Sequence, residues 1–190
     1  MTLFRTVAPA AEPLTLAEAK AHMRVAHAVE DDLIAGLIRA AREEVERATG
    51  LALINQSWRL VLDGWPKGGT VLFRRGPVRE VLSVTVFGAD GGASLIAAET
   101  YQADTISDPA RLHLEDRPPP GTALNGIEID FTAGYGEAGT DVPDLLKRAL
   151  LMLVAHWYEF RGIYGADSQP VSLPESYLRL IAAHKGPRLR

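Results

Sequence analysis

The stretch DDLIAGLIRAAREEVERATG, residues 31–50, decides the fold class for the first part of the chain. Its apolar side chains recur at three- and four-residue spacing, at Leu33, Ile34, Leu37, Ile38, Ala41, Val45 and Ala48. Charged side chains occupy the other face, at Arg39, Arg42, Glu43, Glu46 and Arg47. Gly50 stands where a glycine ends a helix. Residues 31–49 are therefore predicted to form an amphipathic helix with one buried stripe.

Helices are also expected on both sides of this stretch. Thr15 and Glu18 have the spacing of a capping box, which predicts a short helix over 16–24. Pro143 opens a segment that predicts a helix over 144–162. Its wide apolar face is formed by Leu145, Leu146, Ala149, Leu150, Leu153, Val154 and Trp157. A last short helix is expected over 175–185, before a basic tail.

The middle of the chain has the alternating pattern of β-strands. Strands are predicted at 57–62, 70–73, 78–87, 94–97, 101–103, 111–114 and 127–132. Asp90-Gly91 is typical of a hairpin turn. The three consecutive prolines within 117–121 exclude a central strand there. The fold class expected from the sequence is therefore α+β, with helices at both ends of a β-rich region over 57–133.

Composition limits the classes of function. The 190 residues carry a formal net charge of -4, whereas nucleic-acid-binding domains are usually basic. The absence of cysteine excludes disulfides and thiolate zinc sites, and fits a reducing compartment. No signal peptide and no membrane partner are expected, because the most apolar run, around 149–158, is about half of the ~20 residues that a membrane span needs.

The glycine-rich turn from Gly134 to Gly139 matches the pattern G-x-G-x-x-G and follows a predicted strand. A dinucleotide site would require a helix directly after the last glycine, and a second parallel strand ending in an acidic residue about 20 positions on. Four residues intervene before the helix, and the chain about 20 positions on is still helical. A redirecting turn is the favoured interpretation, and a nucleotide-dependent oxidoreductase is the alternative.

Two other features have both a structural and a functional interpretation. His156 and Glu159 share a helix face, but a single such pair with no third ligand nearby favours an ordinary packing role over a metal site. The basic C-terminal tail is either a solvated end or an arm that docks on an acidic partner or on DNA. A DNA-binding module is thus a further alternative. No catalytic, metal or cofactor site is expected.

Five blocks of sequence resemble, in order, the phage head–tail connector (adaptor) proteins of long-tailed phages and of prophage-derived particles such as gene transfer agents. The blocks are PLTLAEAKAHMRV at 13–25, DDLIAGLIRAAREEVERATG at 31–50, SWRLVLDGWP at 57–66, FTAGYG at 131–136 and VPDLLKRALLMLVAHWYEFR at 142–161. No single block is a catalytic motif; the combination in this order carries the resemblance. It implies a structural protein of the virion neck and not an enzyme.

The resemblance also implies an arrangement and a set of partners. Helices 16–24, 31–49 and 144–162 would form a bundle within a core of residues 1–163, and residues 164–190 would form a hinge and a C-terminal arm. The expected bundle and subunit contacts are Leu33, Leu37, Ala41, Leu146, Leu150, Leu153 and Trp157. The expected portal-docking residues are Tyr177, Leu178, Leu180, Ile181, Lys185, Arg188 and Arg190.

The implied assembly is a homo-oligomeric ring, typically a dodecamer, below the portal protein. Such a ring extends the DNA channel, passes DNA without reading its sequence, and receives a head-completion (stopper) or tail-terminator protein. Residues Gly162–Pro174 would serve as the hinge of the arm, so a chain truncated after Pro174 is expected to fold and to lose portal binding.

Overall fold

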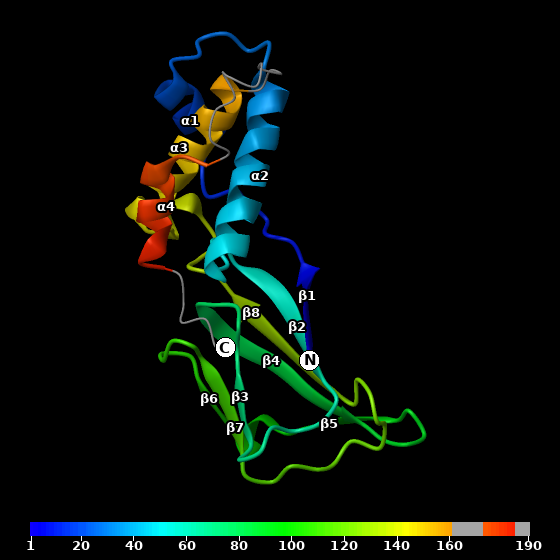
Figure 1. Ribbon diagram of the computed structural model, residues 1–190. Helices are drawn as coiled ribbons and strands as arrows, with labels where there is room; N and C mark the ends of the chain where they lie inside the picture. The colour runs from blue at the N-terminus through cyan, green and yellow to red at the C-terminus, as the bar shows by residue number, and fades with distance from the viewer. Residues whose placement is uncertain (161–172, 185–190) are drawn as a thin grey trace, which may run out of the picture. The chain divides into compact units, whose positions relative to one another are not determined.

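The computed structural model describes residues 1–160 and 173–184 and divides the chain into two compact units. Unit 1 combines residues 1–10 with 55–135, and unit 2 combines residues 11–54 with 136–190. Each unit is thus built from two separate parts of the sequence (Figure 1). This division differs from the expected core of 1–163, because the β-rich region forms a unit of its own together with the N-terminal residues.

Unit 1 contains two antiparallel sheets. The five-stranded sheet has the order β1-β2-β8-β4-β5, formed by β1 (Thr2–Val7), β2 (Gln56–Leu62), β8 (Ile127–Ala133), β4 (Val78–Phe87) and β5 (Ala93–Leu95). The three-stranded sheet has the order β3-β7-β6, formed by β3 (Thr70–Leu72), β7 (Arg111–Leu114) and β6 (Tyr101–Asp104). A short 3-10 helix, η1 (Ala98–Thr100), precedes β6. The predicted strands are confirmed to within one or two residues at each end.

The core of unit 1 lies where the alternating strands point their apolar side chains inward. Strand β8 alternates strictly between buried and half-buried positions, so Ile127, Ile129 and Phe131 are fully buried. The Phe131 ring lies 4.6 Å from the ring of Phe73, which follows β3, and this contact joins the two sheets. Burial of such side chains supplies most of the free energy that stabilises a sheet of this kind.

Strand β1 was not predicted from the sequence. Residues 2–7 pair antiparallel with β2, from Thr2 opposite Val61 to Val7 opposite Ser57. All but one of the six residues are exposed, so β1 has no apolar alternation to identify it. Its conformation depends on pairing with β2, and pairing between distant segments is invisible in a local pattern.

Unit 2 contains the four α-helices, α1 (Leu16–Met23), α2 (Asp31–Thr49), α3 (Asp144–Glu159) and α4 (Glu175–Ala182), and the 3-10 helix η2 (Gly139–Asp141) (Figure 1). Helix α1 contacts α2 and α3, and α4 contacts α3 and α2. The capping box is confirmed, since the Thr15 hydroxyl accepts from the Glu18 N–H at 3.1 Å and Glu18 accepts from the Thr15 N–H at 2.7 Å. Gly50 ends α2 with φ 80°, as predicted.

Helix α3 is shorter than predicted and is fully buried on one side only. It ends at Glu159, where the expected helix continued to 162, and residues 161 and 162 lie outside the described part of the chain. Its buried positions are Leu146, Ala149, Leu150, Leu153 and Val154, whereas Leu145 is 58% exposed. No helix in the described residues has the length and apolar character to cross a membrane.

Candidate assembly surfaces

Most of the predicted contact residues lie inside unit 2. Ala41, Leu146, Leu150 and Leu153 are buried, and Leu37 and Trp157 are half-buried. Only Leu33, at 41% exposed, presents a large apolar surface. The buried side chains therefore pack the helices of unit 2 on one another. Leu33 is the member of the set with the most surface accessible to another subunit.

The predicted docking residues on α4 divide into two groups. Tyr177 and Ile181 are fully buried in unit 2, whereas Leu178 is 39% exposed and Leu180 is half-buried. Burial raises the pKa of the Tyr177 hydroxyl to about 12, with the nearby Glu44 raising and Arg47 lowering it. Lys185, Arg188 and Arg190 lie outside the described residues, as does most of the expected hinge at 162–174.

The prediction that Arg42 lies on the exposed face of α2 was wrong. Arg42 and Glu46 were assigned to the solvent face of α2, but their exposed fractions are 4% and 5%. Arg42 Nε donates to Glu12 Oε2 at 2.8 Å, and its Nη1 donates to Glu46 Oε2 at 3.1 Å. Burial by itself lowers the pKa of Arg42. The hydrogen bond to Glu12 and the negative charges of Glu12 and Glu46 raise the pKa by more than burial lowers it, so the net shift is upward. The guanidinium is thus held charged inside unit 2.

The hydrogen bonds of Arg42 and Glu46 hold two segments against α2, one before α1 and one after α2. Glu12 belongs to the segment before α1, and Glu46 Oε1 accepts from the Leu53 N–H at 2.9 Å in the segment after α2. One buried arginine therefore holds three separate parts of the chain. A periodicity count misses this role because arginine is read as a surface residue unless its partners are known.

A second ion pair joins α1 to α3. Lys147 Nζ lies 2.9 Å from Glu18 Oε1, while the same carboxylate caps α1. The hydrogen bond from the Thr15 backbone, followed by that from Lys147, lowers the pKa of Glu18 to about 2. Helix α2 is joined to α1 by the ion pair of Lys20 with Asp31, in the first turn of α2 where a carboxylate also favours the dipole.

The outer face of the five-stranded sheet is polar at its centre. Arg59 on β2 donates from Nε and Nη2 to Asp130 on β8 at 2.7 and 2.8 Å, and its Nη1 lies 2.8 Å from Glu128. The Ser83 hydroxyl on β4 donates to the same Asp130 at 3.3 Å. This paired-donor geometry links three neighbouring strands. The hydrogen bond to Asp130 raises the pKa of Arg59.

The glycine turn is explained by close packing of the chain on itself. A Cβ on Gly134, whose φ is 151°, would lie 2.5 Å from the Asn55 nitrogen. A Cβ on Gly136 would lie 2.1 Å from Asp141 Oδ2, and one on Gly139 would lie 2.6 Å from the Pro13 carbonyl oxygen. Strand β8 is also antiparallel to both neighbours, so the turn does not belong to a parallel βαβ unit. The glycines therefore allow the tight turn between β8 and α3, which is the interpretation that the sequence favoured.

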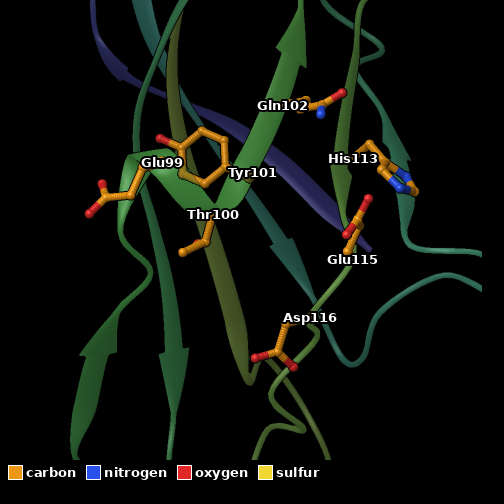
Figure 2. Close-up of a pocket in the computed structure, with 7 residues that line it drawn as sticks. All are labelled: Glu99, Thr100, Tyr101, Gln102, His113, Glu115 and Asp116. Atoms are coloured by element: carbon orange, nitrogen blue, oxygen red, sulfur yellow. The ribbon is translucent and has the colours of Figure 1, made fainter.

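The other candidate sites are the His156 helix face and a pocket on unit 1. The His156 ring packs on Phe160 with the ring centroids 5.0 Å apart. Within residues 1–160 and 173–184, no three histidine or acidic side chains are grouped to hold a metal ion. Figure 2 shows a pocket on unit 1 beside the β6–β7 hairpin, lined by Glu99, Thr100, Tyr101, Gln102, His113, Glu115 and Asp116. Its three carboxylates are exposed, so the pocket presents negative charge to solvent.

Comparisons with known proteins relate the chain to phage neck proteins. Residues 13–74 match the family model of phage gp6-like head-tail connector proteins. Three solved structures match 100% of this chain and 98% of theirs: the neck of an empty gene transfer agent particle computed with C6 symmetry (28% identity, TM-score 0.81), the virion of the native particle (27%, 0.82) and the neck of the native particle computed with C12 symmetry (27%, 0.80). The comparison with curated proteins gave no match. The chain is therefore similar to the phage gp6-like head-tail connector family over residues 13–74, and to chains of gene transfer agent necks and virions over its whole length.

Proposed function

We propose that this protein is a structural head–tail connector subunit in the neck of a gene transfer agent or related phage-like particle. The observation that carries the proposal is the full-length likeness to neck and virion chains, at 27–28% identity and TM-scores of 0.80–0.82. The match of residues 13–74 to the gp6-like connector family gives independent support. A role in assembly agrees with the described helices and sheets, in which Arg42, Lys147 and Arg59 pair with carboxylates of neighbouring elements.

The form of the assembly is a homo-oligomeric ring, which we propose to contain twelve copies below the portal protein. The matched neck structures were computed with C6 and C12 symmetry, which supports a cyclic arrangement. Cyclic rings use head-to-tail contacts between two different surfaces of each subunit. The formal net charge of -4 suits a channel that DNA slides through, because a strongly basic wall would bind the phosphate backbone.

The contact with the portal is assigned to the C-terminal part of unit 2. Leu178 is the exposed large apolar side chain of α4, and the basic residues Lys185, Arg188 and Arg190 follow it in the sequence. Tyr177 and Ile181 support this surface from inside, because they anchor α4 on α3 and α2. The opposite partner is a head-completion or tail-terminator protein.

Deleting the gene in a cell that produces the particles tests the proposal. A connector subunit is needed after the head is filled, so the deletion is expected to give heads that contain DNA but carry no tails. The gene supplied in trans is expected to restore tailed particles in electron micrographs. Tailed, DNA-filled particles produced at the normal frequency by the deletion strain would refute the connector role.

A further inference from the structure

The five-stranded sheet of unit 1 ends in two strands that each have one hydrogen-bonded neighbour among the described residues. Strand β1 pairs with β2 alone, and β5 pairs with β4 alone (Figure 1). The free side of an edge strand carries unpaired N–H and C=O groups, which form a template for another strand. The kind of partner that fits such an edge is therefore an extended segment of protein.

Strand β1 is only partly protected as an edge, by the charge of Arg5 and by a register shift between Arg5 and Val7. Residues Thr2–Val7 contain neither proline nor lysine. Two of its large apolar side chains are exposed, Phe4 at 44% and Val7 at 56%. A six-residue strand with exposed apolar side chains is long enough to pair with another strand, and β2 is the one strand that pairs with it among the described residues.

Strand β5 forms the other edge of the same sheet, and with three residues it can pair with about half of the six-residue β1. Leu95 is 71% exposed and lies opposite Thr85 on β4. Thr85 lies opposite Glu128, as Phe4 lies opposite Arg59, so Phe4 and Leu95 share the outer face of the sheet. Each successive pairing is antiparallel, and four pairings separate the two edges, so β1 and β5 run in the same direction.

We propose that β1 of one copy pairs in parallel with β5 of the next copy, so that the five-stranded sheets of unit 1 form a continuous belt around the ring. This inference rests on the proposed ring. Two edges with different residues and the same strand direction suit a head-to-tail contact, which repeats around a ring. The Arg59–Asp130–Ser83 hydrogen bonds link the three central strands, and so hold the edges at a fixed separation.

The absence of cysteine from the chain allows a direct test by cross-linking in assembled particles. The double variant Phe4→Cys with Leu95→Cys, and a second with Ala93→Cys in place of Leu95→Cys, are made in the full chain. Within one copy the two edges are four strand spacings apart, about 19 Å. A disulfide needs Cα atoms within about 7 Å, so any bond between these positions joins two copies.

The expected result under oxidation is a ladder of covalent oligomers in purified particles, for at least one of the two double variants. Mixing the single variants Phe4→Cys and Leu95→Cys is expected to stop at dimers. Both side chains are exposed, so an unchanged melting temperature of the purified variants checks that the fold is kept. The matched control pair is Val29→Cys with Ile106→Cys, at positions 90% and 97% exposed, and is expected to give monomers.

Three outcomes would overturn the edge contact. One is the presence of the variant chains in the neck without any ladder from either double variant. Another is dimer formation by Phe4→Cys alone, which would show β1 meeting β1. The third is an equally strong ladder from the control pair. Absence of the chain from tailed particles would instead refute the proposed function, so the two failures are distinguishable.

Discussion

At the scale of single residues, the buried charges of unit 2 are the main departure from a simple amphipathic pattern. Arg42 is buried with Glu46 and reaches Glu12, so one guanidinium is paired with a buried carboxylate and with a second carboxylate that is 27% exposed. Removing one member of such a group leaves the remaining charge buried and unpaired. The stability of unit 2 is therefore expected to depend on this residue more than on any exposed ion pair of α2.

Replacing Arg42 tests this dependence. The substitution Arg42→Met is expected to lower the free energy of unfolding by about 3–5 kcal/mol, because Glu46 keeps its buried charge. The matched control is Arg47→Met on the same helix, where the arginine side chain is 73% exposed and pairs with Glu44. The control is expected to cost about 1 kcal/mol or less. Equal losses in urea unfolding would contradict the buried-network account.

The Glu18 carboxylate gives a prediction about pH. Its pKa falls from 4.5 to about 2 on folding, so the folded state favours the charged form. The stabilisation is present above pH 4.5 and is lost as the pH falls toward 2. The substitution Glu18→Gln is expected to flatten that part of the pH dependence, measured by thermal unfolding between pH 2 and 6. An unchanged slope in the variant would show that Glu18 does not contribute.

At the scale of elements, the accuracy of sequence-based prediction depended on whether the pattern is local. Helix α2 and strand β8 carry their periodicity within the element, and both were predicted to within a residue. Strand β1 was missed because its conformation comes from β2. Helix α3 was expected to continue to 162, whereas it ends at Glu159 with Phe160 as its C-cap. The burial of Arg42 depends on Glu12, 30 residues away, and no local pattern contains that information.

Helix α4 changes how the C-terminal arm should be truncated. Ending the chain after Pro174 removes Tyr177 and Ile181, which are fully buried. The sequence pattern alone predicts that this truncation leaves the fold intact, but the loss of two buried side chains is expected to cost at least about 3 kcal/mol of unfolding free energy. Ending the chain after His184 keeps α4 and removes the basic tail.

The two truncations separate folding from docking. The chain that ends at His184 is expected to keep its melting temperature within a few degrees and to lose binding to portal rings in co-sedimentation. The chain that ends at Pro174 is expected to show a lower melting temperature and no portal binding. Normal portal binding by the chain that ends at His184 would show that Lys185, Arg188 and Arg190 are not needed for docking.

At the scale of the whole molecule, the chain combines two units that each fold around their own core. Unit 2 carries the segment that matches the connector family up to Ile54, and the match continues into β2 and β3 of unit 1. The matched neck structures extend the likeness to both units, since they cover the full chain. Both units are therefore expected to take part in the assembly, with the helical unit proposed for portal docking and the sheets for contacts between copies.

A cryo-electron microscopy reconstruction of the neck of particles from the producing cell is the most direct test of the connector assignment. The expected result is a ring of density directly below the portal, into which copies of both units fit. The side chains of Trp58 and Phe131, which lie opposite one another on β2 and β8, are expected to fit the density of each copy. Density for this chain elsewhere in the particle, or a neck ring that fits a different fold, would contradict the assignment.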